Sequence, residues 1–340
     1  MSRKPSGRAS STASPSRSFD KELAELEALK AAPLAAAAIE HLRKALGHRN
    51  NYVVSKAAKI AEENAVAALL PDVLAAYDRF FDDAEKSDPQ CWAKNALVKA
   101  LIALDHREKA TYLRGLKHHQ MEPTWGGRSD TAGTLRGACA HALVNCPGVS
   151  DQELLTLLLE LFADRDKAVR IEAARAIGNV GGPGAVLLLR LRALLGKGEE
   201  PEVLGACYAG LLDLEGARAV PFVAQALEAG DDNSAEAAFA LSAIREPEAL
   251  AALIARRHGI VEEWFDGVLF GAIASSRLPE AIEYLVGIIE RDERAAAMAI
   301  EAIGRAAPSD ETRLRVEQAV RKVGNQRLEK AFREHFPERR

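Results

Sequence analysis

The residue types best suited to metal or acid–base chemistry gather in residues 117–136, which read KHHQMEPTWGGRSDTAGTLR. Imidazoles and carboxylates can bind zinc or iron, and an aromatic ring can anchor a protein partner. The stretch is a long connection within helical sequence, and such insertions in repeat proteins often lie on the binding face. We therefore expect Trp125 and Arg128 to contact a partner. In the structural alternative, Asp130 caps a helix and Trp125 covers the end of a hairpin.

Two cysteines and a histidine, Cys139, His141 and Cys146, lie close together in the sequence and could suggest a zinc site. Cys139 and His141 lie two positions apart on one predicted helix, so their side chains point in different directions. Cys139 and Cys207 occupy the same repeat position, which faces the core, where a free cysteine packs as a small apolar residue. Four cysteines in 340 residues do not make a disulfide scaffold. We predict reduced thiols and no bound metal or cofactor.

The elements that must position these residues are helical hairpins, and residues 151–180 form the clearest one. Leucines at helical spacing give the first helix an apolar stripe, and Asp151 is placed to cap it. Asp166 is placed to cap a second helix, whose core positions begin with Val169 and Ala173. The low aromatic content, 5 %, and the absence of β-branched runs with a period of two favour an all-α protein.

The second helix recurs along the chain at intervals of 30 to 43 residues. We call its first core position the anchor. The anchors are, in order, Val53, Trp92, Leu135, Val169, Val203, Ser234, Phe265 and Ala295. A period near thirty with two helices per unit is typical of a solenoid.

The pattern D-x-x-V-R-x-x-A-A-x-A-I-G, which runs from Asp166 to Gly178, resembles the HEAT-like repeat family first described in phycobilin lyases. The resemblance covers about residues 33–305. It implies the repeat fold but no single function, because such repeats occur in adaptors, bilin lyases, deoxyhypusine hydroxylase and, more distantly, alkyl-base DNA glycosylases. The resemblance to deoxyhypusine hydroxylase would imply two irons held by recurring His-Glu pairs. No His-Glu dipeptide occurs in this chain, which favours a protein that is not an enzyme.

We predict three parts. Residues 1–18 form a basic, Ser-rich tail without acidic residues, which we expect to be disordered. Residues 19–305 form an all-α solenoid, a superhelix of about eight HEAT-like helical hairpins. Residues 306–340 form a C-terminal helical cap, with helices over 310–323 and 326–335.

Charge and hydropathy narrow the classes of partner. The net charge is −4, so a basic footprint for nucleic acid over the whole protein is missing. Between residues 181 and 290, seventeen acidic residues stand against eight basic ones. No signal peptide and no apolar run of the ~20 residues that cross a bilayer is evident, so we expect a cytoplasmic protein without a membrane partner.

Residues two and six places after each anchor point away from the core stripe of their helix. They form a row, which we expect to line the concave face of the solenoid and to change from basic to acidic along the chain. We interpret the protein as a non-catalytic scaffold or adaptor that binds a protein partner along this face. The expected contact residues are Lys59, Lys94, Trp125, Arg128, His141, Arg175, Glu236 and Glu301.

Two other functions stay open at this point. One is a lyase-like or chaperone subunit that acts on a prosthetic group or a protein modification, and the low aromatic content weakens this reading. The other is a nucleic-acid binder that uses the basic N-terminal half, whose affinity would fall steeply with salt.

Overall fold

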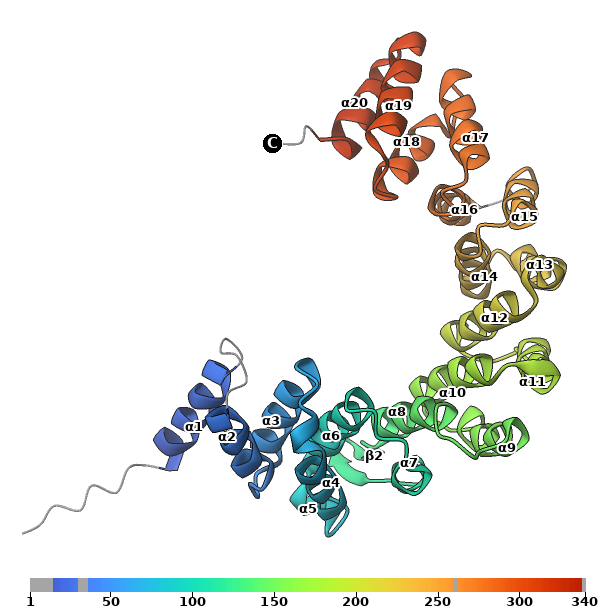
Figure 1. Cartoon of the computed structure of the whole chain (residues 1–340). Helices are drawn as coiled ribbons and strands as arrows, with labels where there is room; N and C mark the ends of the chain where they lie inside the picture. The colour runs from blue at the N-terminus through green and yellow to red at the C-terminus, as the bar shows by residue number, and fades with distance from the viewer. Residues whose placement is uncertain (1–14, 30–35, 260–261, 338–340) are drawn as a thin grey trace, which may run out of the picture. The chain divides into compact units, whose positions relative to one another are not determined.

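The computed structural model describes residues 15–29, 36–259 and 262–337. It divides into two compact units, Met1–Val149 and Ser150–Arg340, which are described separately below. Helices make up most of the described residues (Figure 1), and this confirms the prediction of an all-α solenoid of helical hairpins. Within the described residues no helix combines the length and the apolar character needed to cross a bilayer.

The first unit holds three second helices that pack side by side, α3 against α6 and α6 against α8. The first helices α2, α4 and α7 cover them. The helices of this unit are α1 (Pro15–Leu29), α2 (Ala36–Leu46), α3 (Asn51–Glu63), α4 (Leu70–Arg79), α5 (Ala84–Ser87), α6 (Trp92–Ala103), α7 (Lys109–Leu116) and α8 (Gly133–Val144). Residues 1–14 of the expected tail lie outside the described residues, and residues 15–18 belong to α1.

Between α7 and α8 the chain forms a β-hairpin where the sequence predicted a loop. Strand β1 (Met121–Thr124) pairs antiparallel with β2 (Gly127–Asp130), and Met121 faces Asp130 across the pair. The turn consists of Trp125 and Gly126, and the φ of +90° at Gly126 is a conformation that glycine adopts without strain. These short strands lack the alternating apolar pattern of a half-buried strand, so the sequence did not reveal them.

The second unit repeats one arrangement five times. The second helices α10, α12, α14, α16 and α18 each pack against the next, and α9, α11, α13, α15 and α17 cover them. The bounds are α9 (Asp151–Phe162), α10 (Lys167–Val180), α11 (Gly182–Leu194), α12 (Pro201–Glu215), α13 (Val220–Gln225), α14 (Asp232–Ala243), α15 (Pro247–Arg257), α16 (Glu263–Ser275), α17 (Pro279–Glu290) and α18 (Ala296–Arg305).

Local sequence explains where these helices begin and how closely they pack. The Asp166 carboxylate caps α10 by accepting from the Ala168 N–H at 2.9 Å, as predicted, whereas Ser150 and not Asp151 caps α9. The helices α10 and α12 approach each other at two glycines, where a Cβ on Gly178 would be in ordinary contact, 3.6 Å, with the Gly210 Cα.

The two helices predicted for the C-terminal segment are present as α19 (Asp310–Val323) and α20 (Gln326–His335). Ser309 caps the first, and Asn325 caps the second. Gly324 ends α19 in the left-handed region, with φ of +67°.

Six of the eight anchors lie in the core, and two do not. Val53, Leu135, Val169, Val203, Ser234 and Phe265 are buried, and Ala295 is partly exposed. Trp92 is 51 % exposed, while the next residue, Ala93, is buried. The register of α6 is therefore one residue later than the sequence analysis placed it.

Candidate partner-binding groove

In the second unit, the row of residues two and six places after the anchors lines two hollows. The first, which we call the α12 hollow, has α12 as its floor and α10 and α14 as its walls, with a volume of about 560 Å³. The second, the α16 hollow, has α16 as its floor between α14 and α18, with a volume of about 440 Å³. Phe239 of α14 is 52 % exposed and lines both hollows, so the two are neighbours, and we call the pair the groove.

The floor of the α12 hollow is a single face of α12 made of small residues. Gly205, Ala206, Ala209 and Gly210 lie in the middle of this face, and acidic residues, Glu202 and Asp213, lie at its ends. Positions three, four, seven and eight apart share one side of a helix. The small side chains of Ala206 and Ala209 keep the open part of the floor low, whereas Glu236 covers Gly205 and Leu189 lies against Gly210.

Glu236 of α14 reaches over this floor, because a Cβ on Gly205 would collide with its carboxylate. Among the described residues the carboxylate has neither an ion pair nor a hydrogen bond. Burial raises the pKa of Glu236, and the charge on Glu202 raises it further. An isolated, half-buried carboxylate is thus held where a cation could neutralise it.

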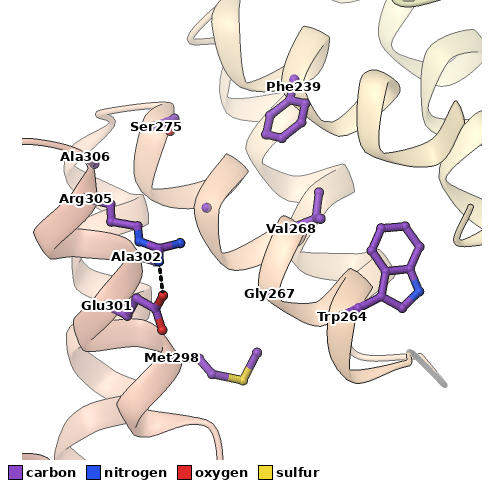
Figure 2. Close-up of a pocket in the computed structure, with 11 residues that line it drawn as sticks. Phe239, Trp264, Gly267, Val268, Ser275, Met298, Glu301, Ala302, Arg305 and Ala306 are labelled. Carbon is purple, nitrogen blue, oxygen red and sulfur yellow. Dashed lines mark ion pairs between the residues drawn. The ribbon is translucent and has the colours of Figure 1, made fainter. Parts of the chain in front are cut away.

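The α16 hollow is more apolar. Trp264 is 45 % exposed and lines it together with Val268 of the floor and Met298 of α18. Figure 2 shows these side chains set around the hollow, with the Glu301–Arg305 ion pair of 2.7 Å on α18. A Cβ on Gly271, in the middle of the floor, would meet no atom within 4 Å.

In the second unit, Glu236 and Glu301 of the row line the groove, and Arg175 lies on its α10 wall. Arg175 is exposed and pairs with Glu172 at 2.6 Å. Glu202, Phe239 and Trp264 also line the groove, and they were not among the contact residues expected from the sequence. The residue before each anchor lies on the same helix side as the row, and this spacing could have revealed Glu202 and Trp264.

Lys94 is a wrong assignment, because it is fully buried. Its ammonium group pairs with the buried Asp88 carboxylate at 3.0 Å and donates to the Phe80 carbonyl at 3.0 Å. The one-residue register error on α6 explains the misplacement. With Ala93 as the anchor, Asn95 and Lys99 take the row positions.

The other candidates of the first unit are scattered. Lys59 is exposed on α3, 3.8 Å from Glu63, and His141 is partly exposed on α8. Arg128 pairs with Glu85 at 3.0 Å beside the β-hairpin. Trp125 is fully exposed at the hairpin turn, so it does not cover the hairpin end as the structural alternative proposed.

The base of the β-hairpin is a network of hydrogen bonds and ion pairs. This network explains why so many histidines and acidic residues occur in residues 117–136. The buried Glu122 carboxylate accepts from the Gln90 N–H at 2.7 Å and from the Thr131 hydroxyl at 2.8 Å. Burial alone would raise the pKa of Asp130, but hydrogen bonds from two backbone N–H groups, His119 and Arg136 lower it to about 2. These groups hold the hairpin in place.

Arg136 and Arg170, which share one repeat position, also have structural roles. Arg136 pairs with Asp130 at 2.7 Å, and Arg170 pairs with Glu199 at 2.7 Å. Both guanidinium groups also donate to backbone carbonyls, Arg136 to His118 and Arg170 to Asp164.

The cysteines do not form a reactive centre. Burial raises the pKa of Cys91 to about 11 and those of Cys139 and Cys207 to about 12, so these thiols stay protonated at neutral pH. Across residues 15–29, 36–259 and 262–337, no group of three His, Cys, Asp or Glu side chains is arranged to hold a metal ion.

A second exposed apolar surface lies on α11, away from the groove. Leu187, Leu191, Leu194 and Leu195 are each more than half exposed on the side of the helix opposite its buried residues, Ala185 and Leu189. The stripe formed by these leucines contains no acidic or basic side chain. This outer face of α11 is the competing candidate for a partner-binding surface.

No protein-family model matches this sequence, and no curated protein matches it. Among solved structures, the chain is similar to human deoxyhypusine hydroxylase in complex with glycerol. The identity is 18 % and the TM-score is 0.29, over 77 % of this chain and 99 % of the other. Similarity at this level carries no argument about function. The repeated helical hairpins of this chain fit a HEAT-like repeat protein.

Proposed function

We propose that this protein is a non-catalytic scaffold that binds a segment of a protein partner in the groove formed by the α12 and α16 hollows. The observation that carries the proposal is the composition of the groove, which combines a floor of small residues with exposed aromatic rings, Phe239 and Trp264. Aromatic side chains around a recessed surface are typical anchors of protein interfaces.

The stability cost of a glycine at position 271, inside α16, also supports this function. A glycine inside a helix costs roughly 0.5–1 kcal/mol of stability relative to alanine. Because nothing within 4 Å would meet a Cβ there, the packing of this chain does not require glycine at this position. Close approach of a bound segment to α16 would require it.

The alternatives fit the groove less well. Asp213 and Glu236 place negative charge without a paired cation in the α12 hollow, and such charge repels the phosphates of a nucleic acid. The resemblance of the repeat pattern to phycobilin lyases predicts a chromophore in the same hollows. A visible absorption band in the purified protein would favour that function over a scaffold.

A displayed library of random twelve-residue peptides, selected against the full chain, tests the proposal. We expect enriched peptides to bind Gly271→Leu at least tenfold more weakly than the wild type, since the leucine fills the α16 hollow. Trp264→Ala should weaken binding by about 2 kcal/mol by removing an anchor. Leu314→Glu, at an exposed site on α19, should bind normally. Enriched peptides that bind Gly271→Leu and Trp264→Ala as tightly as the wild type would contradict the proposal.

A further inference from the structure

We infer that the bound segment is an extended peptide with a lysine or arginine in the α12 hollow and a large apolar residue, about five or six positions away, in the α16 hollow. This inference rests on the proposed function and names the class of partner for the same groove.

The α12 hollow carries negative charge that its described basic residues do not neutralise. Around the groove most carboxylates already have a cation: Glu202 pairs with Lys167 at 2.7 Å, Glu172 with Arg175, and Glu301 with Arg305. Asp213 and Glu236 have no such partner among the described residues. The only basic residue lining this hollow is Arg175, whose guanidinium is already paired. A lysine or arginine of the partner would supply the missing positive charge.

The position of Glu236 decides how a cation can reach it. Its carboxylate packs against Gly205, so its own side chain covers that part of the floor. A cation must therefore reach it from the open side of the hollow, where Ala206 and Ala209 present only small side chains. A long, flexible lysine or arginine side chain meets this requirement.

The α16 hollow has an apolar character. Trp264, Val268 and Met298 surround its floor, and its one carboxylate, Glu301, is neutralised within its own helix. Removing these exposed apolar surfaces from water favours an apolar side chain as the occupant. The polarisable thioether of Met298 adapts to aromatic or aliphatic groups.

The distance between the two hollows sets the spacing of the two side chains in the peptide. Their floors, α12 and α16, are separated by one helix, α14. Packed helices lie 8–10 Å apart, so the floors are on the order of 16–20 Å apart. An extended chain rises about 3.3 Å per residue, which places the cationic and the apolar residues five or six positions apart. The chain between them would cross Phe239.

The test extends the peptide selection, with counter-selection against Gly271→Leu so that only groove-dependent peptides remain. We expect these peptides to pair a lysine or arginine with a Phe, Leu, Met, Trp or Tyr five or six positions away. Groove-dependent peptides that lack a basic residue, or that carry acidic residues instead, would overturn the inference and leave the scaffold function standing. If no peptide depends on the groove, both the inference and the proposed function fail.

One enriched peptide then tests the contact itself. Glu236→Gln should weaken its binding at least tenfold, and replacing its basic residue by alanine should weaken binding to a similar extent without adding to the Glu236→Gln effect. Glu236→Lys should recover binding to a peptide in which glutamate replaces the basic residue. Glu283→Gln makes the same charge change on exposed α17 and should leave affinity unchanged. Equal losses for Glu236→Gln and Glu283→Gln, or fully additive losses in the double change, would contradict a contact at Glu236.

Discussion

Lys94 and Glu236 were both expected two places after an anchor, and the structure gives them opposite environments. Lys94 is enclosed with Asp88, which also accepts from the backbone N–H groups of Ala93 at 2.8 Å and Lys94 at 3.0 Å. Glu236 lines a hollow whose one basic residue, Arg175, is paired with Glu172. At the scale of the residue, the partner of a charged side chain decides whether it stabilises the fold or remains available to a ligand.

Lys94→Ala should therefore destabilise the protein strongly. It leaves the buried Asp88 carboxylate without its cation, and breaking a buried pair in this way costs about 3–5 kcal/mol. Lys59→Ala, at an exposed site on α3, should change the free energy of unfolding by less than about 0.5 kcal/mol. Urea denaturation of both variants measures the difference. Equal, small effects would show that Lys94 is not buried.

The contribution of Glu236 to the free energy of unfolding should depend on pH. Burial, followed by the charge on Glu202, raises its pKa, so the fold favours the protonated form. Stability is then greatest below the ordinary pKa of the carboxyl and falls as the pH rises through the raised value. Glu236→Gln should raise stability at pH 7 by less than ~1 kcal/mol, because the side chain is partly exposed, and should have no effect near pH 4. A destabilised Glu236→Gln at pH 7 would indicate a structural partner for this carboxylate.

Gly271 and Gly115 should respond to alanine in opposite directions. A Cβ on Gly271 meets nothing, so Gly271→Ala should stabilise α16 by roughly 0.5–1 kcal/mol. A Cβ on Gly115 would collide with the Cys139 sulfur and the Tyr77 hydroxyl, so Gly115→Ala should cost about 1–3 kcal/mol. Urea midpoints that move in the same direction for both variants would mean that the open space above α16 is absent.

At the scale of the element, helices were predictable and their register was less so. The sequence analysis placed α10, α19 and α20 within a residue of their bounds, because capping residues and glycines mark their ends. It misplaced α6, where Gln90 and Cys91 adopt left-handed φ angles of 64° and 53° just before the helix. Such angles are uncommon outside glycine and leave no sequence signal, so the core position shifted unnoticed from Trp92 to Ala93.

The β-hairpin carries an exposed aromatic residue, Trp125, at its turn and a buried hydrogen-bond network around Glu122 at its base. Trp125→Ala should leave the melting temperature unchanged, because the ring is fully exposed. Glu122→Ala should lower it, since the Gln90 N–H and the Thr131 hydroxyl lose a buried acceptor, at a cost of about 1–3 kcal/mol. Thermal unfolding followed by circular dichroism compares the two. A drop for Trp125→Ala would place the ring against the body of the protein.

At the scale of the whole molecule, periodicity predicted the solenoid and half of the candidate site. The regular intervals of 30 to 34 residues after Leu135 kept the row in register, so its members line one groove in the second unit. The longer intervals of the first unit contain the α5 segment and the β-hairpin, and there the expected contacts are dispersed. The pairing state of each carboxylate depends on side chains brought together by packing, and sequence spacing alone could not reveal it.

The most direct test of the central claim is to map where a bound segment lies. A selected peptide that carries a photoactivatable diazirine can be cross-linked to the full chain, and mass spectrometry then identifies the modified residues. We predict cross-links to the groove, at Phe239, Trp264 or Met298, and their loss in Gly271→Leu. Cross-links concentrated on the outer face of α11 or on the β-hairpin, and retained in Gly271→Leu, would contradict it.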